Sequence, residues 1–140
     1  MQRKGSALWQ GGLKDGNGQV STGSGGLTNA PYTFASRFES GGKTDPEELI
    51  AAAHAACFSM ALSGQLGQAN LKAERIATTA TVTLEKTDAG MTVTAVHLQV
   101  KAKIPGADQA AFDKAAGNAK AGCPISRLLN AKISMDAALE

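Results

Sequence analysis

The feature that most constrains this chain is a long apolar run over residues 49–62, preceded by a helix-start signal. Asp45 can cap a helix, a proline follows at the first helical position, and Glu48 lies three residues after the cap. Only His54 and Ser59 interrupt the apolar run. The pattern predicts a central helix that is buried nearly all round and ends near the glycines at positions 64 and 67.

Length and charge exclude several classes of protein. At 140 residues, the chain is expected to form one domain over residues 1–140. The net charge is only +2, and no basic run is interleaved with aromatic residues, which argues against a nucleic-acid partner. The apolar run of about a dozen residues is too short to span a bilayer. No signal peptide is expected, so we predict a cytoplasmic protein without a membrane partner.

The remaining segments alternate between predicted strands and helices. Glycine-rich residues 1–42 favour short strands separated by turns. The segments expected are strands at 6–10, 19–22 and 32–39, a hairpin over 75–104 that turns at 88–90 with a bulge near Thr94, helices at 108–120 and 124–129, and a last strand at 131–137. This order predicts the α+β fold class.

Cys57 lies near the middle of the predicted central helix, between Ala56 and Phe58. Burial in apolar surroundings raises the pKa of a thiol and makes it inert, so a reactive Cys57 needs a nearby cation. Arg37 lies towards the end of a predicted strand, with a short loop to the helix, and can fold back over it. The strand pattern by itself favours a surface arginine, because charged strand residues usually face solvent.

Two neighbouring acids open the central helix, and helix geometry separates them. At about 100° per residue, Glu47 lies about 80° from Cys57 around the helix, whereas Glu48 lies about 180° away. A carboxylate alone would make the thiol less reactive. Glu47 therefore has a role near Cys57 only if it orients an arginine by a bidentate pair. The alternative is a first-turn acid that interacts with the helix dipole.

The second cysteine and a nearby histidine are further candidates. Cys123 precedes Pro124, next to a predicted helix N-terminus whose exposed amides favour a thiolate, although it could be a small apolar residue at a tight turn. His54 lies three residues before Cys57, which suits a Cys–His pair or two metal ligands. Both interpretations of His54 lack a third group at a recognisable spacing, so a hydrogen-bonded buried or interface histidine is simpler.

Together these residues make the chain similar to the OsmC/Ohr family, the osmotically inducible protein C and organic hydroperoxide resistance proteins, and most of all to its OsmC branch. The resemblance covers essentially the whole chain. The segments that carry it are PEELI at 46–50, AHAACFSMAL at 53–62 and AGCPIS at 121–126. Arg37, within FASRFE at 34–39, matches the OsmC placement of the arginine, which comes much earlier in the Ohr branch.

The resemblance implies a thiol peroxidase that acts in oxidative and osmotic stress defence. Cys57 would attack the peroxide to give a sulfenic acid and an alcohol or water. Cys123 would resolve it as a Cys57–Cys123 disulfide, which an external dithiol reduces. Arg37 would stabilise the thiolate and the departing oxygen, and Glu47 would hold Arg37 in place. A lipoylated protein is the family-level candidate for the reductant.

The family fold sets the expected architecture. The resemblance implies antiparallel sheets packed around a long buried central helix, in an interlaced homodimer with active sites at the subunit interface. No metal or organic cofactor is expected. Apolar neighbours of the thiol such as Phe34, Phe38 and Phe58 would favour organic hydroperoxides over hydrogen peroxide.

Three other functions remain open at this point. The same scaffold could be a non-catalytic redox sensor or could bind a lipid or other small molecule in an apolar interface pocket. A metal-binding protein would use His54, Cys57 and Cys123. A Cys–His hydrolase is the weakest alternative, because nothing in the sequence supplies an oxyanion hole or a third group to orient the histidine.

Overall fold

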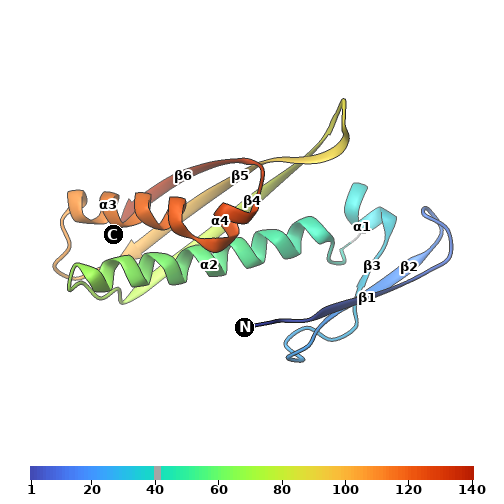
Figure 1. Ribbon diagram of the computed structural model, residues 1–140, viewed down its shortest axis with the longest axis horizontal. Coiled ribbons are helices and arrows are strands. Elements are labelled where there is room, and N and C mark those ends of the chain that lie inside the picture. The colour runs from blue at the N-terminus through green and yellow to red at the C-terminus, as the bar shows by residue number, and fades with distance from the viewer. Residues whose placement is uncertain (40–41) are drawn as a thin grey trace. The chain divides into compact units, whose positions relative to one another are not determined.

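The computed structural model describes residues 1–39 and 42–140, which divide into two units, Met1–Leu49 and Ile50–Glu140. Each unit contains one three-stranded sheet. The long helix α2 (Pro46–Gln68) begins in the first unit and continues through the second (Figure 1). The α+β class predicted from the sequence is confirmed.

The first unit is built on an antiparallel sheet of short strands. β1 (Gly5–Gln10) pairs with β2 (Asn17–Thr22), which pairs with β3 (Ala30–Tyr32). Glycine is required at one point of this sheet, position 18. A Cβ on Gly18 would come within 2.8 Å of the Trp9 ring and 2.6 Å of the Tyr32 ring, so the two aromatic side chains occupy the space a side chain there would need.

The predicted strand over 32–39 is wrong, because only its first residue is in a strand and Phe34–Phe38 form the short helix α1. The cause is a reciprocal cap at Thr33. Its side-chain oxygen accepts a hydrogen bond from the Ser36 amide at 3.1 Å, and the Ser36 hydroxyl accepts one from the Thr33 amide at 2.9 Å. These local bonds close a helical turn and override the alternation of apolar residues. Phe34 and Phe38 lie one turn apart, with ring centroids separated by 4.8 Å.

The start of α2 is as predicted, whereas its end is not. The Asp45 carboxylate accepts a hydrogen bond from the Glu48 amide at 2.8 Å, which confirms the cap. The helix runs through both glycines and ends at Gln68. Asn70 then adopts the left-handed conformation, with φ of 56°, and the Leu71 amide bonds back to the Leu66 carbonyl at 2.9 Å. Asparagine thus fills the position for which a glycine was expected.

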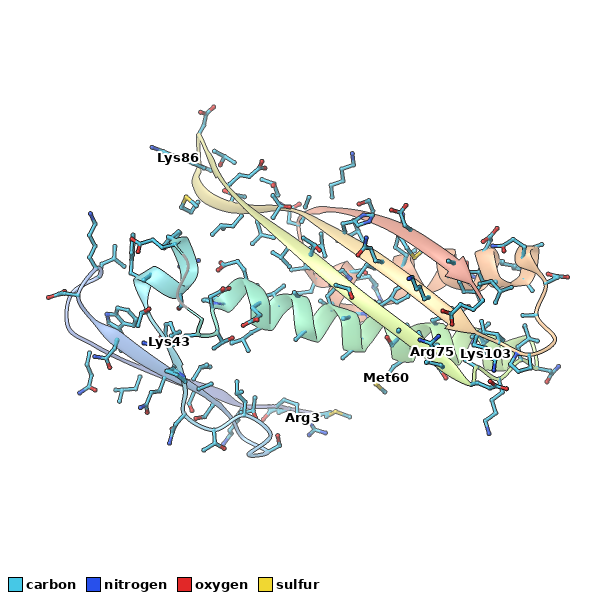
Figure 2. The ribbon with its side chains drawn as sticks, turned by 180° about the vertical axis from the view of Figure 1, so that it is seen from behind. Arg3, Lys43, Met60, Arg75, Lys86 and Lys103 are labelled. Carbon is cyan, nitrogen blue, oxygen red and sulfur yellow. The ribbon has the colours of Figure 1, made fainter. Side chains whose placement is uncertain are left out.

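The expectation that α2 is buried nearly all round is wrong for the single chain. Its fully buried residues form one stripe with a spacing of four: His54, Phe58, Leu62 and Leu66. Met60 projects from another face and is 78% exposed (Figure 2). By length and hydropathy alone α2 could cross a membrane, a property that core helices of soluble proteins share.

The second unit begins with the predicted hairpin. β4 (Arg75–Thr87) pairs with β5 (Gly90–Lys103) in antiparallel register. The register shifts between Thr83 and Leu84 and leaves Thr94 as the extra residue of the expected bulge.

The third strand of this sheet departs from the expected antiparallel order. β6 (Lys132–Leu139) runs parallel to β5. A parallel neighbour requires the chain to return to the end of the sheet from which it started. The helices α3 (Gln109–Gly122) and α4 (Pro124–Leu128) form this crossover.

The hydrophobic core of the second unit lies between one face of its sheet and two helices. α2 and α3 lie on the same face of the sheet (Figure 1). The buried side chains of this core come from α2, from β5 and the residue after it, and from α3: Phe58, Leu62, Leu66, Leu98, Val100, Ala102, Ile104, Phe112, Ala115, Ala116 and Ala119. The stripe on α2 therefore determines which side of that helix faces the sheet.

This packing makes a prediction about stability. Leu62→Ala should lower the free energy of unfolding by about 2–5 kcal/mol, because it removes a fully buried side chain and leaves a cavity. Met91→Ala, at a half-exposed position, should change it by less than about 0.5 kcal/mol. Urea denaturation at one protein concentration measures both, and equal losses would contradict the assigned core.

Candidate redox site

The two cysteines of the chain lie side by side in the second unit. Cys57 is half-buried on α2, and Cys123 is fully buried at the junction of α3 and α4. Their sulfurs are 2.6 Å apart. A disulfide bond is about 2.05 Å long, so a shift of about half an ångström would join them. The approach of these two residues within one chain could not be deduced from their spacing.

The junction that holds Cys123 is built from helix ends. The Cys123 amide bonds to the Ala119 carbonyl at 2.9 Å and closes α3, while the Cys123 carbonyl accepts from the Arg127 amide at 3.1 Å and opens α4. Pro124 occupies the first position of α4, where its missing N–H costs nothing. The sequence motif Gly-Cys-Pro therefore marks the break between α3 and α4, with a thiol at the junction.

The surroundings of Cys57 within the second unit favour its protonated form. Burial raises the pKa of the Cys57 thiol, and the contact with Cys123 raises it further. The backbone amide of Ile125 acts in the opposite direction, with a smaller effect on the same pKa. A thiolate at Cys57 therefore requires a positive charge that these neighbours do not provide.

His54 is fully buried and bonded to one side chain. Its Nε2 lies 2.7 Å from the hydroxyl oxygen of Ser126, whereas Nδ1 has no partner among the described residues. Burial lowers the pKa of His54, which favours the neutral imidazole. The simpler interpretation of His54, a hydrogen-bonded buried histidine, is confirmed. Ser126 was not identified from the sequence. A signal was present, because Ser126 follows Cys123 by three residues, and His54 precedes Cys57 by the same number.

Arg37 and Glu47 form a bidentate salt bridge in the first unit. Arg37 Nε donates to Glu47 Oε2 at 3.0 Å, and Nη2 donates to Oε1 at 2.7 Å. The Glu47 side chain is only 13% exposed, compared with 36% for Arg37. The bond to Glu47 raises the pKa of Arg37, so the guanidinium stays charged. The Cζ atom of the Arg37 guanidinium lies 5.1 Å from the centroid of the Phe38 ring, within the range of a cation–π contact.

An aromatic groove of about 270 Å³ lies beside Arg37 in the first unit. Its lining consists mainly of rings and other apolar groups: Trp9, Leu13, Tyr32, Thr33, Phe34, Arg37, Phe38 and Pro46. Phe34 and Phe38 thus line a groove that contains the guanidinium. Phe58, which was expected to act with them, is instead fully buried in the core of the second unit.

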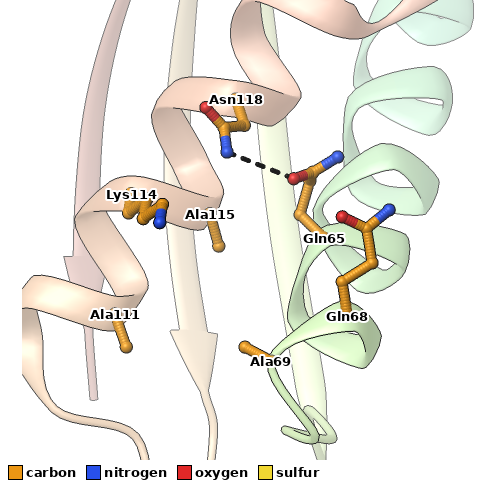
Figure 3. A pocket seen from close by; sticks show the side chains of 7 residues that line it. All are labelled: Gln65, Gln68, Ala69, Ala111, Lys114, Ala115 and Asn118. Carbon is orange, nitrogen blue, oxygen red and sulfur yellow. Dashed lines mark hydrogen bonds between the residues drawn. The ribbon is translucent and has the colours of Figure 1, made fainter.

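A second groove, of about 420 Å³, lies between α2 and α3 (Figure 3). Gln65 on α2 and Asn118 on α3 meet across it in a hydrogen bond of 3.3 Å. The other residues that line it are Gln68, Ala69, Ala111, Lys114 and Ala115. None of these seven residues is a cysteine or a histidine.

A metal site has no support in the part of the chain that the structure describes. Within residues 1–39 and 42–140, no three His, Cys, Asp or Glu side chains converge in a way that could hold a metal ion. His54, Cys57 and Cys123 do not form such a group. The reactive groups that the structure describes are therefore the Cys57–Cys123 dithiol in the second unit and the Arg37–Glu47 pair beside aromatic rings in the first.

Comparison with known proteins identifies the family. The family described as OsmC-like protein matches residues 39–137. The chain belongs to the OsmC family. Over 136 residues it is 51% identical to the protein named peroxiredoxin OsmC of Escherichia coli (strain K12). The matched region covers 97% of this chain and 95% of that protein. The protein of the same name from Shigella flexneri matches equally well.

Solved structures agree with this OsmC assignment. An OsmC-like protein of unknown function from Vibrio cholerae superposes with a TM-score of 0.79 at 15% identity and covers 99% of both chains. An organic hydroperoxide resistance protein OsmC from Legionella pneumophila has a TM-score of 0.68 at 26% identity, covering 98% of this chain and 96% of that one. The resemblance inferred from the sequence motifs is therefore confirmed.

The buried imidazole makes a prediction about pH. In the folded chain the pKa of His54 lies below its usual value of about 6.5, whereas the unfolded chain binds the proton near that value. The unfolded state therefore takes up more protons as the pH falls through about 6.5, and the free energy of unfolding should decrease. In His54→Gln this part of the decrease should vanish. Urea denaturation from about pH 7.5 to about pH 5.5 tests it.

The control for this prediction is His97→Gln, which replaces the only other histidine and should retain the decrease due to His54. An unchanged pH dependence in His54→Gln would show that the decrease has another origin.

Proposed function

We propose that this OsmC-family protein is a thiol-dependent peroxidase that reduces organic hydroperoxides to alcohols. The observation that carries the proposal is the 2.6 Å approach of the half-buried Cys57 sulfur to the fully buried Cys123 sulfur. An accessible thiol can meet a substrate, and a second thiol in contact with it can complete a disulfide. The relatives named peroxiredoxin OsmC support the same chemistry.

The first step oxidises Cys57. Its thiolate attacks one peroxide oxygen, an S–O bond forms, and the O–O bond breaks. The departing alkoxide takes a proton and leaves as an alcohol, or as water when the substrate is hydrogen peroxide. Cys57 is left as a sulfenic acid, and the peroxide has gained two electrons.

The second step converts the sulfenic acid into a disulfide, which an external reductant can return to two thiols. The Cys123 sulfur attacks the Cys57 sulfur, the S–S bond forms, the S–O bond breaks, and the hydroxyl leaves as water with the Cys123 proton. An external dithiol then reduces the Cys57–Cys123 disulfide by thiol–disulfide exchange and is itself oxidised to a disulfide. A lipoylated protein would supply such a dithiol. No metal or organic cofactor takes part in either step.

Arg37 and Glu47 are proposed to supply the missing charge. The pKa of Cys57 is raised by burial, so formation of the thiolate needs a cation, and Arg37 is permanently charged. Arg37 would stabilise both the thiolate and the negative charge on the departing oxygen. The bidentate bond to Glu47 supports this role because it holds the guanidinium in one orientation before substrate binds.

The remaining parts of the proposal concern substrate and assembly. The aromatic groove beside Arg37 supports a preference for hydroperoxides with an organic group over hydrogen peroxide. We propose that residues 1–140 act as one OsmC-like domain in an interlaced homodimer, which would cover the exposed side of α2 around Met60. The protein would act in the cytoplasm in defence against oxidative and osmotic stress.

The proposal is tested by peroxide consumption with dithiothreitol as reductant, using cumene hydroperoxide and hydrogen peroxide. Wild type should turn over and consume cumene hydroperoxide faster. Cys57→Ser should fall to background, because the nucleophile is absent. Cys123→Ser should stall as a sulfenic acid or lose most of its turnover, because the Cys57–Cys123 disulfide cannot form. A wild type that reacts once and then stops would instead indicate a redox sensor, and one that does not react would indicate a binding protein.

The charged pair makes a separate prediction. Arg37→Met should lower kcat/KM by about 10²-fold, the usual cost of removing one group that stabilises developing charge. Glu47→Gln should lower it less, because the cation remains but is held less firmly. Arg3→Met, which removes an exposed arginine, serves as the matched control and should have wild-type kinetics. Wild-type activity in Arg37→Met would exclude the proposed role of Arg37.

A further inference from the structure

We propose that His54 and Ser126 are a positioning pair, whose hydrogen bond holds Cys123 against Cys57 before the disulfide forms and so sets how fast Cys123 attacks the Cys57 sulfenic acid. This inference rests on the proposed peroxidase cycle and adds two residues to its second step. The two side chains touch neither substrate nor the reacting sulfurs in this proposal. They act through the placement of α4 on α2.

The geometry that supports the proposal is a two-point attachment. The first point is the contact between the Cys57 and Cys123 sulfurs, and the second is the His54–Ser126 bond of 2.7 Å. His54 precedes Cys57 by three residues, and Ser126 follows Cys123 by three, which is about one helical turn in each case. Contacts at the Cys57 sulfur alone would let α4 tilt about that sulfur, within the limits of its chain connections to α3 and β6. The second contact, one turn away on both segments, opposes that tilt.

Little else on α4 can perform this task. The helix has five residues, none of which is fully buried, so apolar packing holds it weakly. Its backbone bonds, such as those from Arg127 to Cys123 and from Leu129 to Ile125, lie within the turn itself. The thiol contact of Cys123 and the hydrogen bond of the Ile125 amide are both made to the Cys57 sulfur. The His54–Ser126 bond joins α2 and α4 at a second place, one turn away from that sulfur.

The choice of a histidine also needs an explanation. His54 is fully buried in the stripe of α2 that packs on the sheet, and its Nδ1 has no partner among the described residues. A buried polar atom without a partner is destabilising, and an apolar side chain of similar volume would fill the space without that cost. Packing alone therefore does not account for His54, whereas its bond to Ser126 does.

The proposed role affects one branch point of the cycle. The Cys57 sulfenic acid can be attacked by Cys123 to give the disulfide and water. It can instead react with a second hydroperoxide, which oxidises it to the sulfinic acid and is reduced to an alcohol. The ratio of the two products depends on how well Cys123 is placed. It does not depend on how fast the sulfenic acid was formed, so the ratio isolates the second step.

The test is to expose the fully reduced protein to a range of cumene hydroperoxide concentrations without reductant and to measure both products by intact mass. Ser126→Ala and His54→Phe should each raise the ratio of sulfinic acid to disulfide about fivefold, the effect of losing one ordinary hydrogen bond. His54→Gln, whose side-chain amide can still donate to Ser126, should return the ratio towards the wild-type value.

A matched control comes from the other histidine of the chain. His97 Nδ1 lies 2.7 Å from the Ser134 hydroxyl on the neighbouring strand, a bond of the same type and length. Ser134→Ala removes that bond and should leave the ratio unchanged. This control separates a role in placing Cys123 from a general loss of rigidity in the second unit.

Three outcomes would contradict the proposal, and they can be told apart. If wild type closes its disulfide but Ser126→Ala and His54→Phe have the wild-type ratio, the positioning role is wrong and the peroxidase proposal stands. If His54→Gln behaves as His54→Phe does, the hydrogen bond is not the cause. If wild type forms neither product, the peroxidase proposal fails and the positioning role fails with it.

Discussion

The burial of one stripe of α2 against the second sheet is the interaction on which the rest of this unit depends. His54, Phe58 and Leu62 follow one another at intervals of four residues and are fully buried. Once they face the sheet, the rotation of α2 about its axis is determined. Cys57 is adjacent to Phe58 in sequence, so it comes to the border of the buried stripe, where it is half-buried and in contact with Cys123.

That position creates a conflict between stability and reactivity. A thiol at the edge of a core is protected from bulk solvent, which limits unwanted oxidation, but the same burial raises its pKa and disfavours the nucleophilic thiolate. The chain does not resolve the conflict next to Cys57 within the second unit. The first unit contains a guanidinium that is always charged and is fixed by two bonds to Glu47. The proposed chemistry needs both properties, a sheltered sulfur and an oriented cation.

The same unit shows how a short helix can be functionally important without contributing much to the core. α4 has five residues, and none is fully buried, yet its N-cap and first turn contain the groups that contact α2 at Cys57 and His54. Cys123, the Ile125 amide and Ser126 each face α2 or its side chains. Polar contacts rather than buried apolar area therefore determine the placement of α4. One of them, the contact between the two thiols, is replaced by a covalent bond when the disulfide forms.

Features determined by neighbouring residues were predictable from the sequence. The Asp45 cap, the hairpin turn and the bulge at Thr94 follow from local rules of capping, turn composition and alternation. Local rules also failed where two of them competed. At Thr33, a side-chain cap with Ser36 outweighed the alternation that predicted a strand, and at the end of α2 Asn70 replaced the expected glycine cap.

By itself the sequence determined the α+β class, the family and the residues able to do chemistry, because composition, periodicity and motifs are properties of short segments. Only the tertiary structure decided which of those residues meet. Cys57 and Cys123, and His54 and Ser126, are brought together by the crossover that places α4 on α2. Such pairs depend on the packing of segments far apart in the chain, and no local pattern encodes a distance between them.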